Sequence, residues 1–469
     1  MKNLLLIVAL ACLLTLPRIG LTQTVKEVFA FSNANSSATP SGPLVQGRDG
    51  KLYGTTNGVG RTIVTDGTVF RLSTAGKWSS LHAFAGTDGA NPSAGLLLAT
   101  DGNYYGTGQY GGNTGWGLLF KITPTGVFNI LYQFTGGADG GHPAAALIQA
   151  SDGNLYGTTF PGTLDSGTVY KYAPLTGTFS TILSLSQDGS QGQQISAPVV
   201  QAADGNLYGT AIFGGANGCG SIFRIATTGT LLQVYSFPCG AGGSAPSGPL
   251  LQASDGNLYG TTTVGGNVTS QGECQSGCGT IFRLSHGLVT VLYQFSGYPS
   301  DGGIAASGLV QGTDGNLYGG TFKGGANDQG VLYQITITGQ YKLLYSFAEP
   351  IGHGADSAPM QHTNGKFYGV TTYGGHYLEG AMYSLDMGLG PFIALGRYTG
   401  RIGQPVPILG QGLIGSTSVT VNGVPATSFK VFSNTYMTAV IPTGATTGPV
   451  VVTTPNGNLT SNHNLRIVQ

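Results

Sequence analysis

The sequence predicts an all-β protein in which a seven-bladed β-propeller of about 50-residue, four-stranded repeats precedes a small β-sandwich. Three observations support this prediction. A six-residue phrase recurs seven times at a nearly constant period. Each repeat holds four short strand signals separated by turn residues. The period then stops near residue 388, and a segment of different pattern runs to residue 469.

The recurring phrase is Asp-Gly-Asn-Leu-Tyr-Gly or a close variant. Its copies begin at Asp49, Asp101, Asp152, Asp204, Asp255, Asp314 and Asn364. The copies are 50 to 52 residues apart, except for one spacing of 59. A period of this length is typical of units that stack or close into a ring because no single unit is stable alone.

The second repeat illustrates the four strands of one unit. Strands are expected at residues 95–99, 103–107, 117–122 and 128–134, with Asp101-Gly102 forming the first hairpin turn. No segment shows a helical apolar period over 11 or more residues. Four strands in each of seven repeats predict a propeller over residues 24–388. An open β-solenoid is the alternative, but its coils are usually shorter and lack two hairpins.

The first and last repeats indicate how the ring closes. The last repeat has a third strand at residues 381–385 but no clear fourth strand. A fourth-strand phrase, Val28-Phe29-Ala30-Phe31, stands before the first repeat. We therefore expect the N-terminal segment to complete the last blade, which would remove an open sheet edge.

The repeated phrases resemble a known family. "DGNLYGTT", "GG…G…FRL" and "LYQF" with a following "GG.DG..P.AGL" recur in order over roughly residues 25–388. They are similar to the Gloeo/Verruco tandem repeat, the GloVer repeat of choice-of-anchor bacterial surface proteins. The resemblance implies a bacterial exported or surface protein and no known catalytic activity. The sequence departs from the family pattern in one respect, because we find no sorting signal, with its apolar helix and basic tail, among its last residues.

The C-terminal segment, residues 389–469, has five strand candidates separated by Asn-Gly and Thr-Gly turns. This pattern predicts a small immunoglobulin-like β-sandwich. The runs at residues 419–426 and 441–450 resemble an IPT/TIG domain, an immunoglobulin E-set module. Such modules mostly serve as spacers, packing surfaces or binding platforms.

Residues 1–22 have the pattern of a secretory signal peptide. Lys2 precedes an apolar run from Leu4 to Leu16 that is too short to span a bilayer. Lipidation at Cys12 is the alternative. No later stretch approaches the roughly 20 apolar residues of a transmembrane helix. We expect a secreted or cell-surface protein, extracellular or periplasmic.

Four cysteines remain after the expected cleavage, and an even number in an exported chain usually pairs. Cys219 precedes the third strand of its repeat and Cys239 follows the fourth, so the two should be neighbours in a hairpin. Cys274 lies in the eight-residue insertion that explains the spacing of 59, close to Cys278. We predict the disulfides Cys219–Cys239 and Cys274–Cys278. Zinc binding is the competing interpretation.

The sequence offers little catalytic chemistry. Lys+Arg and Asp+Glu number 19 each, and a formal net charge of zero argues against a nucleic-acid binder. No HExxH pattern or GxSxG elbow is present. Each repeated Asp is expected to cap its own turn, with calcium binding as the alternative. A second series at Asp88, Asp139, Asp188 and Asp301 lies in inter-blade loops. We predict no catalytic residue, cofactor or metal.

Ligand contacts are expected on the face of the ring that carries the long, variable loops. The candidates are Tyr110, Trp116, Lys323, Tyr373, His376 and Tyr377. Our leading hypothesis is a monomeric, non-enzymatic binding or scaffold protein at the cell surface or in the extracellular matrix, with an extracellular glycan or protein as partner. The alternative is a secreted polysaccharide lyase or hydrolase built on a propeller.

Overall fold

The structure is a computed structural model that describes residues 23–468 except 33–38, 59–65, 162–165, 268–273 and 275. The expected signal peptide, residues 1–22 with Cys12, lies outside the described residues. Within them, no helix is both long and apolar enough to cross a membrane.

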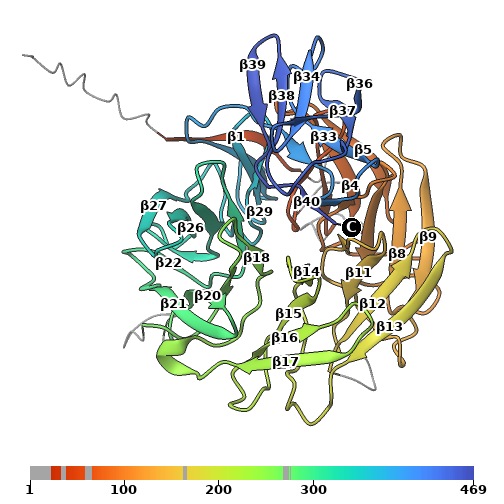
Figure 1. The fold of residues 1–469 in the computed structure, drawn as a ribbon. Coiled ribbons are helices and arrows are strands. Elements are labelled where there is room, and N and C mark those ends of the chain that lie inside the picture. Colours follow the sequence, from red (N-terminus) through yellow and green to blue (C-terminus); the bar gives the residue numbers. More distant parts are fainter. Residues whose placement is uncertain are drawn as a thin grey trace, which may run out of the picture.

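Most of the chain forms a ring of four-stranded antiparallel sheets (Figure 1). Seven such sheets occur in the ring among the described residues, and we number them blades 1 to 7 in chain order. The first strand of each blade is short and lies toward the centre, as β14 and β18 show (Figure 1). The all-β, propeller-like prediction is thus confirmed.

The strands of the ring have the following bounds. Blade 1 contains β2 (Val45–Gln46), β3 (Leu52–Thr56), β4 (Thr68–Leu72) and β5 (Trp78–Ala83). Blade 2 contains β6 (Leu97–Leu98), β7 (Tyr104–Gly108), β8 (Leu118–Ile122) and β9 (Phe128–Gln133). Blade 3 contains β10 (Ile148–Gln149), β11 (Leu155–Thr158), β12 (Thr168–Ala173) and β13 (Thr178–Ser184). Blade 4 contains β14 (Val200–Gln201), β15 (Leu207–Ala211), β16 (Ser221–Ile225) and β17 (Leu231–Ser236).

Blade 5 contains β18 (Leu251–Gln252), β19 (Leu258–Thr262), β20 (Thr280–Ser285) and β21 (Leu288–Gln294). Blade 6 contains β23 (Leu309–Gln311), β24 (Leu317–Gly320), β26 (Val331–Ile335) and β27 (Tyr341–Ser346). Blade 7 contains β28 (Met360–Gln361), β29 (Phe367–Thr371), β30 (Ala381–Asp386) and β1 (Thr24–Ala30). Loops contribute the short pair β22 (Gly302–Gly303) and β25 (Lys323–Gly324) and a 3-10 turn at Gly240–Gly242.

Strand β1 closes the ring as the sequence predicted. It pairs antiparallel with β30 from Thr24 opposite Asp386 to Ala30 opposite Ala381, with a bulge between Glu27 and Phe29. Phe31 follows β1, is completely buried, and packs edge-on against Phe70 of blade 1 with ring centroids 5.3 Å apart. The N-terminal strand therefore ties blade 7 to blade 1.

The repeated phrase forms a tight turn at the same end of every blade. In blade 2 the backbone N–H of Asn103 donates to Asp101 Oδ1 at 3.0 Å, and the Tyr105 hydroxyl donates to Asp101 Oδ2 at 2.9 Å. Gly102 follows with φ +87°, a conformation that favours glycine. Equivalent tyrosine–aspartate hydrogen bonds recur in blades 1 and 3 to 6. The repeated carboxylates and phenols therefore stabilise turns.

A glutamine in the first strand of most blades reaches back to the preceding blade. The backbone N–H of Thr100 in blade 2 donates to Gln149 Oε1 at 2.9 Å, and the same contact recurs around the ring. Blade 2 has Leu98 at this position. There Arg48 Nη2 donates to the Thr100 carbonyl at 2.7 Å instead.

The C-terminal segment forms a separate two-sheet sandwich. One sheet has the order β31 (Ala394–Leu395), β33 (Pro405–Leu409), β37 (Tyr436–Val440) and β36 (Ser428–Val431). The other has β35 (Val424–Pro425), β34 (Ser418–Val421), β38 (Val450–Thr454) and β39 (Gly457–Thr460). A third, parallel pair joins β32 (Thr399–Gly400) to β40 (Arg466–Ile467). Between the sheets lies a core that includes Val406, Val421, Met437, Val450 and Leu465.

The sandwich rests on the tight-turn face of the ring, above blades 1 and 7 (Figure 1). The Thr435 hydroxyl donates to the Arg48 carbonyl at 2.7 Å, and the Arg48 guanidinium lies 4.5 Å from the Tyr436 ring centroid. Gln411 Nε2 donates to the Thr363 hydroxyl of blade 7 at 2.9 Å. The chain then crosses the ring, where the Arg466 guanidinium donates to the Ala203 carbonyl of blade 4.

Both predicted disulfides are confirmed. Cys219 and Cys239 are joined with Cα atoms 5.5 Å apart, and Cys274 and Cys278 with Cα atoms 4.8 Å apart. The first links the ends of β16 and β17, and the second lies within the inserted loop of blade 5.

Candidate functional site

The six candidate ligand contacts all lie in loops, but the described contacts divide them into two groups. Tyr110 and Trp116 belong to the first group, in blade 2. Their rings lie 4.8 Å and 4.7 Å from the ring of His142, which belongs to the connection into blade 3. The indole of Trp116 lies directly against Gly136, where any Cβ would collide with it. Tyr110 remains 44% exposed.

Blades 6 and 7 carry the second group. The Tyr373 ring stacks on His353 at 5.6 Å and meets Phe322 edge-on at 6.3 Å. Glu349 and Lys323 lie close enough to act electrostatically on His353. Burial lowers the pKa of His353 and Lys323 lowers it further, while Glu349 opposes both. The imidazole therefore favours its neutral form.

His376 and Tyr377 extend the second group along the loop after β29. Their rings meet edge-on at 4.7 Å, and Tyr377 is 56% exposed. Carboxylate, imidazole, ammonium and phenol groups thus gather on the variable-loop face at blades 6 and 7. Such mixed chemistry can bind polar ligands.

The inter-blade aspartates are engaged by the loops that carry them. Asp88 accepts a hydrogen bond from the backbone of Ala85, Asp139 from Thr135, Asp188 from Ser190 and Asp301 from Ser296. Among the described residues, no group of three or more His, Cys, Asp or Glu is placed to hold a metal ion. These observations give the calcium alternative no support.

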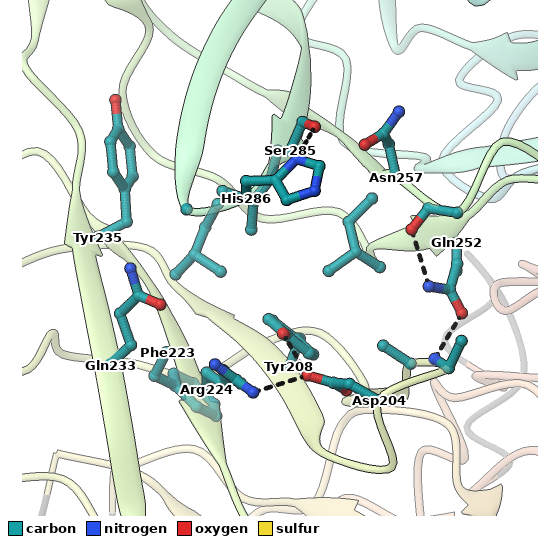
Figure 2. Close-up of a pocket in the computed structure, with 17 residues that line it drawn as sticks. Asp204, Tyr208, Phe223, Arg224, Gln233, Tyr235, Gln252, Asn257, Ser285 and His286 are labelled. Atoms are coloured by element: carbon teal, nitrogen blue, oxygen red, sulfur yellow. Dashed lines mark hydrogen bonds and ion pairs between the residues drawn. The ribbon is translucent and has the colours of Figure 1, made fainter.

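A cavity of about 520 Å³ lies elsewhere, between blades 4 and 5 on the tight-turn side (Figure 2). Blade 4 lines it with Ala203, Asp204, Tyr208, Phe223, Arg224, Gln233 and Tyr235, and blade 5 with Gln252, Asn257, Leu284, Ser285, His286 and Gly287. Ala203 is also the residue that Arg466 contacts, so the end of the sandwich reaches the rim of this cavity.

The floor of the cavity holds one closed ion pair. Arg224 Nη2 lies 2.9 Å from Asp204 Oδ2, and the Tyr208 hydroxyl donates to the same oxygen at 2.9 Å. Burial raises the pKa of Asp204, but hydrogen bonds from Asn206 and Tyr208 and the charge of Arg224 lower it below its usual value overall. Asp204 is the only acidic side chain of the lining, so two-carboxylate glycoside hydrolysis has no support here.

A model of the Gloeobacter/Verrucomicrobia repeat matches residues 15–163, 94–273 and 268–416, which together span most of the sequence. The chain belongs to this repeat family. None of the curated proteins compared with it matches significantly.

Three solved structures are similar to this repeat protein over most of its length. A fungal alcohol oxidase of the AA5 family, solved with copper, covers 92% of this chain and 98% of its own at 12% identity, with a TM-score of 0.53. Oligogalacturonate lyase from Vibrio parahaemolyticus covers 78% of this chain and 97% of its own at 12% identity, with a TM-score of 0.47. Hydrazine synthase of Kuenenia stuttgartiensis covers 71% of this chain and 93% of its own at 12% identity, with a TM-score of 0.48. At 12% identity the likeness to the alcohol oxidase extends to the fold alone.

The residues that line the cavity were not among the sequence candidates. Two signals in the repeat alignment could have found them. The fifth repeat has the short turn Ser285-His286-Gly287-Leu288 where the second has Thr123-Pro124-Thr125-Gly126. It also has Val289 at the position that Phe128 occupies in the second.

Proposed function

We propose that this Gloeobacter/Verrucomicrobia repeat protein is an exported, non-enzymatic binding or scaffold module that acts at the cell surface or in the extracellular matrix. One observation carries the proposal. The repeated carboxylates and phenols, which are the ring's most abundant acid–base groups, are engaged in turn hydrogen bonds. The chemistry left for recognition lies in the parts of the blades that do not repeat.

Two further features support an exported protein. The two disulfides suit an oxidising compartment, where such bonds persist. The N-terminal pattern suits a signal peptide over residues 1–22. We also propose that residues 389–469 form an IPT/TIG module, because its signature phrases fall on β34 and the approach to β38.

The loop surface of blades 6 and 7 is the part of the variable face that we assign to partner binding. Tyr373 and Tyr377 expose 44% and 56% of their surfaces, and the charges of Lys323 and Glu349 both act on His353, on which Tyr373 stacks. Exposed aromatic rings among polar groups are favourable contacts for sugars and peptides. A rigid ring that presents them requires little ordering on binding, which favours affinity.

Glycan-array and cell-surface binding by the purified chain would test this proposal. The double variant Tyr373→Ala/Tyr377→Ala should lose binding, while Leu175→Ala, which alters a fully exposed turn residue of blade 3, should retain it. Release of product from any polysaccharide in the same panel would contradict the non-enzymatic proposal.

The second candidate function is a polysaccharide-active enzyme, and the group at blades 6 and 7 favours it. Glu349, neutral His353 and Tyr373 supply the residue types that act as general acids and bases. Incubation with a polysaccharide panel, followed by detection of new reducing ends and unsaturated products, tests this function. Activity that disappears in His353→Gln would establish it.

A further inference from the structure

We propose that the cavity between blades 4 and 5 binds a neutral pyranose sugar, which stacks on Tyr235 and is hydrogen-bonded by Gln233, Arg224 and His286. This site lies on the tight-turn side of the ring, away from the loop surface of blades 6 and 7. The inference therefore stands independently of the function proposed above.

The aromatic ring of Tyr235 lacks the stacking partner that its counterparts have at other blade interfaces. At four other blade interfaces, the residue equivalent to Tyr235 stacks on an aromatic ring of the next blade. The pairs are Phe29–Trp78, His82–Phe128, Tyr132–Phe179 and Tyr293–Tyr341, with centroids 6.5, 3.9, 3.7 and 4.1 Å apart. At the interface between blades 4 and 5, the position in blade 5 that should supply the stacking ring for Tyr235 is occupied by Val289. One face of Tyr235 is thus left without the aromatic cover found at those interfaces.

A shortened turn between β20 and β21 of blade 5 leaves the cavity open. In blade 2 the turn after β8 brings Gly126 over the Leu81 carbonyl of blade 1, where a Cβ would lie at 3.0 Å. Blade 5 has a two-residue turn instead, with φ +50° at His286 and +81° at Gly287, as a type I′ hairpin requires. The shorter turn approaches the Gln233 side chain rather than the backbone of blade 4. The resulting volume is within the range of small-molecule sites.

The charged side chains that line the cavity are paired with each other. Asp204 and Arg224 neutralise each other through their 2.9 Å contact, so the floor offers neither a free carboxylate nor a free guanidinium charge. His286 also lines the cavity, and its ring is bonded to the Ser285 hydroxyl at 3.0 Å (Figure 2). A neutral ligand avoids the cost of burying an unpaired charge here.

The cavity lining also provides hydrogen-bonding groups. The Gln233 side chain makes no hydrogen bond among the described residues, and its amide offers two donors and an acceptor. The Arg224 guanidinium also lines the cavity, and it has more N–H donors than its contact with Asp204 uses. Gln233 and Tyr235 lie on one side of the cavity and Asn257 on the other (Figure 2). A sugar supplies hydroxyl donors and acceptors around an apolar ring face, which fits this distribution.

Calorimetric titration of the full chain with D-glucose, D-galactose, D-mannose and N-acetyl-D-glucosamine tests the proposal. At least one should bind. Val289→Phe should abolish binding while keeping or raising the melting temperature, because the new ring restores the inter-blade stack. Gln233→Ala should weaken binding about threefold to tenfold, the effect of one lost hydrogen bond.

Asn129→Ala is the matched control, because Asn129 holds in blade 2 the place of Gln233 in blade 4. It should bind as the unmodified chain does. The proposal is overturned if none of the four sugars binds, or if binding survives unchanged in both Val289→Phe and Gln233→Ala. Much tighter binding of D-glucuronate than of D-glucose would overturn the assignment of a neutral ligand.

Discussion

The seam between blades 7 and 1 and the interface between blades 4 and 5 join equivalent surfaces, but they are built differently. At the seam, Gln46 of blade 1 bonds twice to Thr363, and His362 lies 3.0 Å from the Gly50 carbonyl. The C-terminal sandwich adds its own contacts to Thr363 and Arg48. Between blades 4 and 5, the glutamine contact is kept but Tyr235 meets Val289 and a cavity remains.

The difference follows from how the blades are connected. Blades 4 and 5 are consecutive in the chain, so a short linker keeps them together even where their packing is incomplete. Blades 7 and 1 are held together through β1, by side-chain contacts and by backbone hydrogen bonds such as that from Thr39 to the Glu379 carbonyl, so opening this seam would expose two sheet faces. Contacts therefore accumulate where the ring must close, and a ligand site can develop where the chain itself holds neighbouring blades.

The largest expected effect comes from breaking the seam. Phe31 and Phe237 are both completely buried and make the same edge-on contact with the next blade, to Phe70 and Phe282. Phe237→Ala should cost about 3–5 kcal/mol, as for other buried phenylalanines. Phe31→Ala should cost more, because β1 can then detach. Equal losses in chemical denaturation would show that the seam is no different from other interfaces.

The disulfides should have the next largest effect. Replacing Cys219 and Cys239 together by Ser should destabilise the protein by about 3 kcal/mol, since the bridge closes a loop of 20 residues. Replacing Cys274 and Cys278 should cost about 2 kcal/mol, because that loop spans only 4. Denaturation of both double variants measures the difference, and a larger loss for the second pair would contradict the loop-length argument.

Substitution of the glutamines sharpens the comparison further. Gln46→Leu leaves the N–H of Thr363 without its partner, and Thr363 is completely buried, so we expect a loss of about 1–3 kcal/mol. Gln252→Leu frees the N–H of Ala203, which is exposed and can bond to water, so the loss should stay within about 0.5 kcal/mol. Leu98 shows that a blade tolerates leucine here. Similar losses in the two variants would contradict this contrast.

The sequence predicted the parts of this molecule that repeat, because repetition reveals which residues every blade requires. Ring closure by β1 and both disulfides followed from comparing the repeats position by position. The cavity escaped prediction because it arises from what blade 5 lacks, an aromatic ring at Val289 and a longer turn at His286. The grouping of Tyr373 with His353 also escaped, since it depends on how the connection from blade 6 folds against the loop of blade 7.

The smallest expected effect is a pH dependence in the blade that closes the ring. Asp356 precedes β28, where blades 1, 2, 4 and 5 have serine at the equivalent position. Solvent reaches part of this side chain, yet the surrounding protein disfavours its charge, and burial raises its pKa from 3.8 to about 6 against an opposing hydrogen bond from Thr372. Between these values the folded state retains a proton that the unfolded state has lost.

Stability should therefore decrease as the pH rises from 4 to 6, because the unfolded state binds fewer protons there. Asp356→Asn removes this titration but keeps an acceptor for the Thr372 hydroxyl. Its melting temperature relative to the unmodified chain should rise across this interval and then level off. The effect should be modest, because solvent screens part of the charge. A difference that is constant with pH, or one that grows toward acid, would show that Asp356 titrates as an ordinary surface carboxylate and that the surrounding protein imposes no cost on its charge.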